Sequence, residues 1–169
     1  MPATVNVNMR TVVHASSNGQ VMGFPDVCKT PTPAGPVPIP YPNVAMSSNL
    51  AQGSTTVKMD GNPIAVEQSN FSTSTGDEAG SAGGGVVSNT IKGKAEFVMN
   101  SFDVKVDGKG ACRMLDIMLL NKQSAPNTPP FPELQPPAVV ISIPVPEPSE
   151  DEPSISQFEV TDRGQEQKQ

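Results

Sequence analysis

Short runs of alternating apolar and polar residues are the main pattern along the chain. Four such runs, at residues 56–60, 64–67, 95–99 and 102–106, place an apolar side chain at about every second position. A period of two is typical of strands that bury one face. Helical spacing of apolar residues is nearly absent, so the sequence predicts an all-β fold built from short strands.

Two turn signals join these runs into hairpins. Asp60-Gly61 and Asp107-Gly108 each lie next to one or two of the runs. An Asp-Gly pair favours the type I′ turn, in which both central residues need a positive φ. Residues 57–66 align with residues 104–113 so that both turns coincide, which indicates a repeated hairpin. The alternative is that two unrelated hairpins share a common hairpin sequence.

Three further segments have unusual compositions. Residues 69–85 are almost entirely small and form either a flexible linker or a tightly packed system of turns. Residues 30–43 carry six prolines, which predict an extended, stiff segment without ordinary pairing in a sheet centre. This segment is interpreted as a strap across the domain; a ligand for a proline-binding groove is the alternative. The apolar run at residues 114–120 is expected in the core; the alternative is an exposed surface on which another component docks.

Charge divides the chain near Lys122. Residues 1–122 hold nine basic and nine acidic residues, whereas residues 123–169 hold two basic and eight acidic residues and ten of the nineteen prolines. The whole net charge of −6 therefore belongs to the second part. A neutral body argues against binding nucleic acid or a membrane surface through a basic patch. We expect one domain at 1–122 and a proline-rich acidic tail at 123–169, with a strand at 138–145 that pairs with the body or with a partner; an inert tail is the alternative.

Targeting signals and cysteines bear on the compartment. The sequence starts without the apolar core of a secretory signal, and no apolar stretch is long enough for a membrane-spanning helix. We therefore expect a cytoplasmic protein, or one that leaves by a route that reads no cleavable signal. In such a protein Cys28 and Cys112 are expected as free thiols or metal ligands, not as a disulfide.

Three stretches carry a family resemblance. They are Phe24–Asn43, which contains Pro-Ile-Pro-Tyr, then Thr75–Asn89, and then Phe102–Lys109 followed by Cys112-Arg113. The chain resembles, through them, the PAAR-like proteins of the type VI secretion system, in the branch marked by the Pro-Ile-Pro-Tyr motif. The stretches cover most of residues 10–122. The resemblance implies a small cone of short β-hairpins with pseudo-threefold symmetry.

The resemblance also implies a function. Such a protein is a structural tip that caps a trimeric VgrG-type spike, one tip per trimer, and touches the target membrane transiently when a contractile sheath fires it. It would be cytoplasmic before firing and would then be secreted with the spike complex. The alternative is an effector-loading adaptor that uses residues 123–169 to attach a cargo toxin or its chaperone to the spike. No nucleic-acid partner is expected.

The resemblance also implies a metal site, because typical members of the family hold zinc with three histidines and one cysteine. This chain has one histidine and two cysteines, so its candidate metal ligands are His14, Cys28 and Cys112. Zinc prefers four tetrahedral ligands, and the fourth would be Asp26, Asp116 or water. The alternative is that the cysteines are small buried apolar residues and that the histidine lies on the surface. No spacing typical of a catalytic triad or a metalloprotease helix is present, so we expect no enzyme.

Overall fold

The computed structural model describes residues 3–136. These residues belong to a compact unit, Met1–Ala138, that is separate from a second unit, Val139–Gln169. The strand predicted at residues 138–145 and most of the acidic tail lie outside the described residues.

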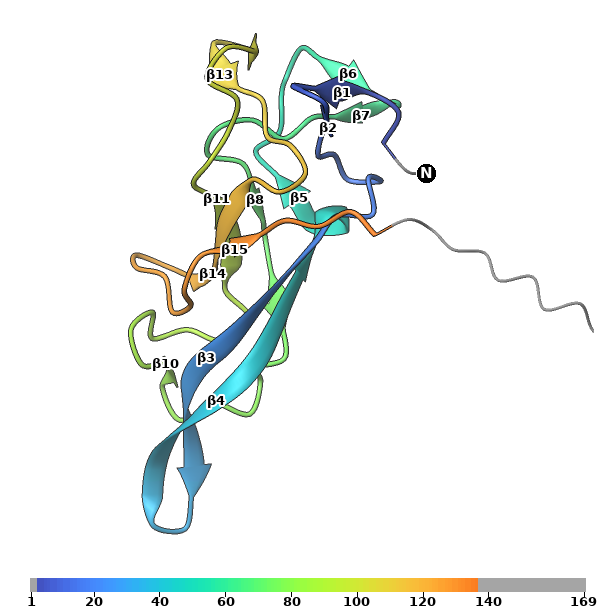
Figure 1. The fold of residues 1–169 in the computed structure, drawn as a ribbon. Coiled ribbons are helices and arrows are strands. Elements are labelled where there is room, and N and C mark those ends of the chain that lie inside the picture. Colours follow the sequence, from blue (N-terminus) through green and yellow to red (C-terminus); the bar gives the residue numbers. More distant parts are fainter. Residues whose placement is uncertain (1–2, 137–169) are drawn as a thin grey trace, which may run out of the picture. The chain divides into compact units, whose positions relative to one another are not determined.

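Antiparallel strands make up nearly all of the regular structure in this unit, which confirms the predicted all-β fold (Figure 1). Most of the strands are short, as predicted, but β3 and β4 have 13 and 12 residues. Two larger sheets have the strand orders β10-β3-β4-β9 and β15-β14-β11-β8-β5, and three further pairs of strands form separate hairpins. No helix in the described part of the chain is long and apolar enough to cross a membrane. The elements are β1 (Asn6–Val7), β2 (Arg10–Thr11), β3 (Gln20–Thr32), β4 (Gly35–Met46), the 3-10 helix η1 (Ser47–Asn49), β5 (Leu50–Ala51), β6 (Lys58–Met59), β7 (Asn62–Pro63), β8 (Asn70–Phe71), β9 (Ser74–Thr75), β10 (Gly84–Gly85), β11 (Lys94–Phe97), β12 (Lys105–Val106), β13 (Lys109–Gly110), β14 (Ile117–Lys122) and β15 (Phe131–Pro132).

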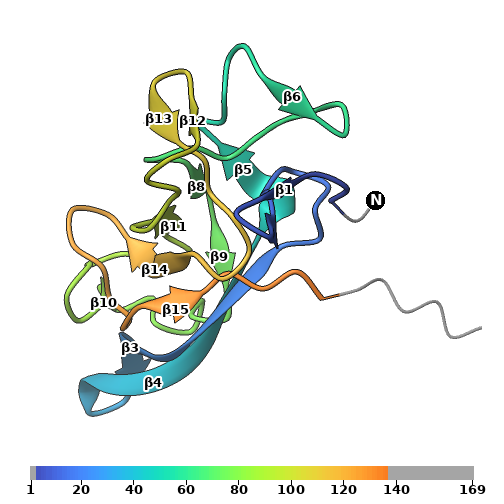
Figure 2. The same ribbon diagram turned by 45° about the horizontal axis from the view of Figure 1, so that its top comes forward.

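The proline-rich segment forms one strand of a long two-stranded ribbon. β4 pairs with β3 from Met46 opposite Gln20 to Gly35 opposite Thr32, with one irregularity. This pairing differs from the prediction of a strap without ordinary strand pairing. The ribbon extends away from the end of the unit at which the three separate hairpins lie, as Figures 1 and 2 both show.

The spacing of the prolines explains why the ladder forms. The carbonyl oxygen of Pro42 lies so close to Gly76, which follows β9, that a Cβ on this glycine would stand 2.0 Å from it. Because β9 flanks β4 on the edge opposite β3, the backbone of Pro42 faces away from β3. Every second residue of a strand faces the same edge. The missing N–H groups of Pro36, Pro38 and Pro40 are therefore those of the outer edge, and the residues between them supply the donors to β3.

The main apolar core lies between the two larger sheets. The rings of Phe71 and Phe97 meet edge to face, with centroids 5.7 Å apart. Met118 and Leu120 of β14 are completely buried in the same cluster, which confirms the prediction that residues 114–120 contribute to the core. The buried members are Val13, Val21, Ala45, Ala65, Phe71, Ala95, Phe97, Cys112, Met118 and Leu120.

The compact unit extends beyond the domain boundary expected at Lys122. β15 pairs with β14, and the backbone of Leu134 exchanges hydrogen bonds of 2.7 Å with that of Gln20. Residues up to 136 are therefore part of the body, although their proline content resembles that of the tail.

Candidate functional site

Three hairpins of the same construction lie at one end of the unit (Figures 1 and 2). Their turns are Asn8-Met9, Asp60-Gly61 and Asp107-Gly108, and all six residues have φ between 51° and 78°. The two Asp-Gly turns were predicted from the sequence. The first hairpin was missed because Asn-Met lacks the glycine that usually marks a type I′ turn.

A closed ring of backbone hydrogen bonds joins the segments that follow the second strand of each hairpin. Val13 N–H donates to Cys112 O at 3.2 Å, Cys112 N–H donates to Ala65 O at 3.0 Å, and Ala65 N–H donates to Val13 O at 2.7 Å. These three residues occupy the same position in their hairpins. The ring therefore confirms the predicted pseudo-threefold symmetry and extends the repeat from two copies to three.

The hairpin turns repeat the same cyclic order through side chains. The second turn contacts the segment before the first hairpin, the third turn that before the second, and the first turn that before the third. The equivalent residues in these segments are Thr4, Thr56 and Asp103. Hydrogen bonds, above all from Thr56, lower the pKa of Asp107 to about 2. The contacts are Thr4 N–H to Asp60 at 2.8 Å, Thr55 N–H and Ser54 Oγ to Asp107 at 2.9 and 2.8 Å, a hydroxyl bond from Thr56 to Asp107, and Asn8 Nδ2 to Asp103 at 3.0 Å.

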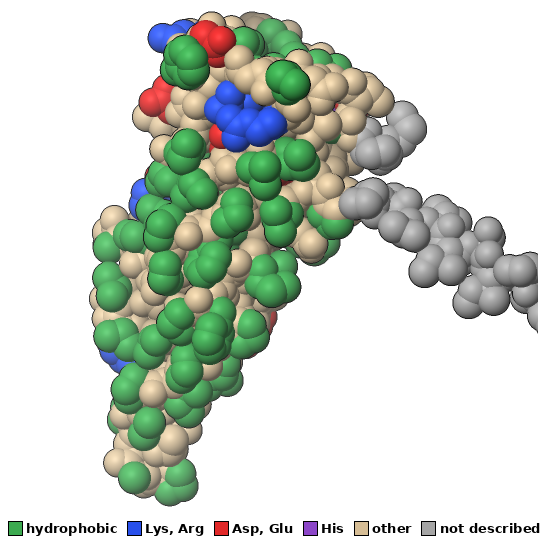
Figure 3. Space-filling model, viewed as in Figure 1, with side chains coloured by type: hydrophobic (Ala, Val, Ile, Leu, Met, Phe, Trp, Pro, Cys, Tyr) green, Lys and Arg blue, Asp and Glu red, His purple; other side chains and the backbone are tan. Residues whose placement is uncertain are grey.

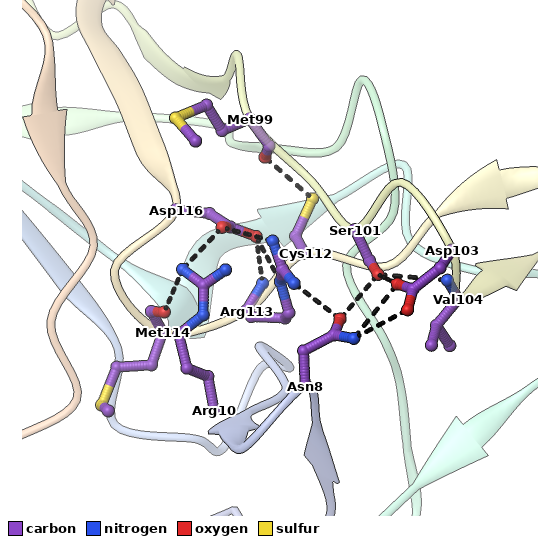
Figure 4. A network of polar contacts seen from close by, with 10 residues as sticks. All are labelled: Asn8, Arg10, Met99, Ser101, Asp103, Val104, Cys112, Arg113, Met114 and Asp116. Atoms are coloured by element: carbon purple, nitrogen blue, oxygen red, sulfur yellow. Dashed lines mark hydrogen bonds and ion pairs between the residues drawn. The ribbon is translucent and has the colours of Figure 1, made fainter.

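The ring is followed by three equivalent positions with different side chains, His14, Val66 and Arg113. His14 is fully buried, and its Nε2 lies 3.1 Å from a carboxylate oxygen of Asp60. Arg113 pairs with the buried carboxylate of Asp116 at 3.1 Å (Figure 4). The three hairpins therefore share a backbone but not their chemistry.

Cys112 lies beside the Arg113 pair and belongs to the apolar core (Figure 4). Its Sγ contacts the backbone oxygen of Met99 at 4.0 Å. Burial and the nearby Asp116 raise the pKa of this thiol far above its ordinary value. Cys112 is thus a neutral apolar side chain, as one of the two sequence interpretations expected, and both cysteines are free thiols.

A second set of polar groups is completely buried at the base of the ribbon. Asp26 and Cys28 come from β3, and Asp77 comes from the small-residue segment that follows β9. One ligand atom of each lies within 4.8 Å of the others. Burial, followed by the charges of Asp26 and Asp77, raises the pKa of Cys28 to about 12. Burial also raises the pKa of Asp77 to about 6.

Three asparagine side chains surround this Asp26–Cys28–Asp77 cluster. Nδ2 of Asn43 donates to Asp26 at 2.6 Å, and Nδ2 of Asn121 donates to it at 3.2 Å. Asn127 also donates to Asp26, and its Nδ2 lies 2.9 Å from the backbone oxygen of Val27. The cluster therefore links β3, β4, β14 and the loop before β15.

Three glycines pack against the cluster, two from the small-residue segment and one directly before β11. A Cβ at Gly80 would lie 2.2 Å from Cβ of Cys28, and one at Gly85 would lie 2.5 Å from Cγ of Asn127. A Cβ at Gly93 would lie 2.6 Å from Oδ1 of Asn121. This contact geometry favours the packed turn system over the flexible linker as the interpretation of residues 69–85.

The structure places the predicted ligands in three surroundings. His14 contacts Asp60, Cys112 lies in the core, and Cys28 is grouped with Asp26 and Asp77. Within residues 3–136, one group of at least three ligand side chains is close enough to share an ion, and it consists of Asp26, Cys28 and Asp77. Asp26 was named from the sequence as a fourth ligand. Asp77 was missed, because only the packing of the glycine-rich turns brings it to β3.

The surface of the ribbon is apolar. Residues 30–57 contain no charged residue, and Met22, Phe24 and Met46 are each about half exposed. Figure 3 shows hydrophobic side chains gathered over this part of the visible face, while most charged side chains lie toward the hairpin end.

Comparison with known proteins places these features in a family. The family model described as "Toxin PAAR-like domain" matches residues 19–127. The chain is also 39% identical over 134 residues to the DNase toxin Tse7 of Pseudomonas aeruginosa, an alignment that covers 75% of this chain and 35% of the relative. The chain thus spans about a third of the length of that relative. No solved structure matches. The ribbon, the Asp26–Cys28–Asp77 cluster and the last two hairpins all lie within the matched residues, and the chain belongs to the Toxin PAAR-like domain family.

Proposed function

We propose that this chain is a structural tip that caps a trimeric VgrG-type spike in a type VI secretion system and helps it to puncture target membranes. The family membership supports a role in toxin delivery. In this proposal the protein is cytoplasmic before firing and leaves the cell as part of the spike complex. A structural metal ion, zinc in the first instance, stiffens the tip.

The ring of three hairpins is the observation that carries this proposal. A single chain meets a threefold partner without mismatch only if it offers three equivalent surfaces. Val13, Ala65 and Cys112 mark three such positions in one backbone cycle. Each hairpin also has two short edges, which can align with strand ends of a trimer.

Binding to a purified VgrG trimer tests the proposal. We expect a complex with one tip chain per three spike chains, measured by native mass spectrometry or light scattering. Lys58 and Lys105 occupy equivalent exposed positions in the second and third hairpins. If the hairpin end meets the trimer, Lys58→Glu and Lys105→Glu should weaken binding at least tenfold, whereas Val37→Glu in the exposed ribbon should not. Failure of the wild-type chain to bind, or binding of three tips per trimer, contradicts the proposal.

The second candidate is an effector-loading adaptor, which the toxin relative favours. Tse7 is described as a DNase toxin, and the chain covers only 35% of its length. A chain cut after Ala138 keeps the whole compact unit. An adaptor should lose its cargo toxin after this cut and still bind the spike, whereas a tip alone should behave as the full chain does in both assays.

We assign no catalytic step to this chain. Its single histidine is fully buried and contacts Asp60, and the thiol of Cys28 has a pKa of about 12, so neither is a ready base or nucleophile. The nuclease activity in the name of the relative is said of that longer protein.

A further inference from the structure

We infer that Asp26, Cys28 and Asp77 bind one divalent zinc-type cation, which fixes the glycine-rich turns to the base of the β3–β4 ribbon. The inference deepens the proposed role as a rigid tip, and the purpose that we give to the ion, stiffening the tip, rests on that role. Of the three ligands that the sequence suggested, only Cys28 belongs to this set. Asp26 was one of the choices for the fourth ligand, and Asp77 is new.

The charge of the cluster is the first reason. Asp26 and Asp77 are both completely buried, and neither takes part in an ion pair within the described residues. Lys29, the nearest basic residue in sequence, donates to Asn89 instead. Lys92 offers Asp77 only its backbone N–H, at 3.0 and 3.1 Å. Amide and backbone N–H groups offset part of the cost of burying these carboxylates, but they leave the two charges without a cation, which a divalent metal ion would supply.

The kind of ligand is the second reason. Two carboxylate oxygens and one thiol sulfur lie within 4.8 Å of one another on two segments that are far apart in sequence. Zinc accepts sulfur and carboxylate ligands in one site, whereas calcium and magnesium take oxygen ligands almost exclusively. The single sulfur therefore favours a zinc-type ion.

An unpartnered oxygen at the cluster is the third and independent reason. Asn43 is fully buried and its side chain points at Asp26, since Nδ2 lies 2.6 Å from that carboxylate. Oδ1 of the same amide is buried and has no hydrogen-bond partner. A buried acceptor is nearly always satisfied in folded proteins. An ion in the cluster provides a positive charge toward which this amide can turn its oxygen.

The surroundings make the ion structural. Gly80, Gly85 and Gly93 pack so closely on Cys28 and the asparagines that even a methyl group at any of them would clash. A site closed by backbone has no open position for a substrate, which is the arrangement of structural zinc sites. Binding releases the thiol proton, because the S–H bond of Cys28 breaks as the sulfur–metal bond forms, together with any proton held by the carboxyl groups, and these protons pass to solvent or buffer.

Metal content of the full-length chain tests the inference. The protein is treated with chelator, reloaded with zinc, desalted and measured by inductively coupled plasma mass spectrometry. We expect one zinc per wild-type chain and at least a tenfold loss in Cys28→Ala and Asp77→Asn. Cys112→Ala is the matched control, because it removes the other buried thiol, and it should keep its zinc. A wild-type chain without zinc, or equal zinc in Cys28→Ala, overturns the inference.

Cobalt provides a readout that needs no substitution at the proposed ligands. Loaded with Co²⁺, the wild-type chain and Cys112→Ala should both show the near-ultraviolet charge-transfer band of a cobalt thiolate. Its absence from both rules out Cys28 as a ligand. Spike binding is measured on the same samples. A chain that binds the trimer but no metal refutes the ion alone, and a chain that binds metal but no trimer refutes the tip function alone.

Discussion

Met9 stands where the other two hairpins carry glycine. Its φ is 65° and its side chain is 97% exposed, so no packing compensates for the left-handed backbone. This conformation costs an L-residue about 1 to 2 kcal/mol, and glycine avoids that cost. Glycine loses more conformational entropy on folding, however, so the net gain is smaller. We expect Met9→Gly to raise the free energy of unfolding by up to about 1 kcal/mol, measured by urea denaturation.

Met22→Gly is the control for that substitution. Met22 is also exposed but lies in β3, where glycine weakens a strand by about 0.5 to 1 kcal/mol. The two variants should therefore change stability in opposite directions. A loss of stability in Met9→Gly would show that the side chain makes a contact the fold needs.

Glu133 is a buried acid, and neither of its carboxylate oxygens has a hydrogen-bond partner of good geometry within the described residues. Burial raises its pKa to about 8; the side chain of Gln135 is near enough to offset a part of this, and the charge of Asp116 adds to it. The folded chain thus keeps this proton while the unfolded chain loses it near the ordinary value of 4.5. Stability from the neutral acid is complete below that value and is lost as the pH rises toward 8. The wild type should therefore lose stability between pH 4.5 and 8, while Glu133→Gln, which has no proton to lose, should not. We expect the difference in unfolding free energy to shift by a few kcal/mol in favour of the variant across this range, on the order that the pKa difference implies.

Denaturation of both proteins at several pH values measures this gain. Glu78→Gln is the control, because backbone N–H groups of Glu78 and Gly76 lower the pKa of that exposed acid. Its effect relative to the wild type should run in the opposite direction with pH. A constant difference between Glu133→Gln and the wild type from pH 4.5 to 8 would mean that Glu133 is ionised in the folded chain.

At the scale of elements, the outer edge of β4 is closed by its prolines. Pro36, Pro38 and Pro40 leave that edge with carbonyl acceptors but few N–H donors, so another strand cannot pair along it. We expect the triple replacement of these prolines by threonine to expose a regular edge beside an apolar face. Concentration-dependent self-association, measured by sedimentation velocity, should follow.

Val37→Thr is the matched control for the edge. It introduces the same side chain at a residue that already has its N–H group, so it should leave the chain monomeric. If the triple variant also stays monomeric with its β-structure intact, the prolines do not protect the edge.

The two hairpin turns and the ribbon show what the sequence alone could predict about the elements. Asp-Gly turns are local signals and were found, while Asn8-Met9 makes the same turn without a local signal. The effect of the prolines depends on which edge of β4 they face. That information comes from β9 and Gly76, which are distant in sequence.

At the scale of the whole compact unit, the all-β class and the family could be predicted because they rest on local patterns and long matching stretches. The extent of the body could not. Composition places a boundary at Lys122, but Phe131 and Leu134 pair with strands of the body. The cluster was predicted in part for the same reason: Asp26 and Cys28 are two residues apart in the sequence, whereas Asp77 reaches them only through tertiary packing.

The backbone ring also dictates an order of assembly. Val13 donates to Cys112, which lies 99 residues later, and no one of the three bonds joins neighbouring segments. The first hairpin emerges early during synthesis but cannot complete its edges until the third has been made. Contacts of such large sequence separation close late and slowly. A nascent chain shorter than about 113 residues therefore has unpaired edges to which a chaperone or a neighbouring chain can bind.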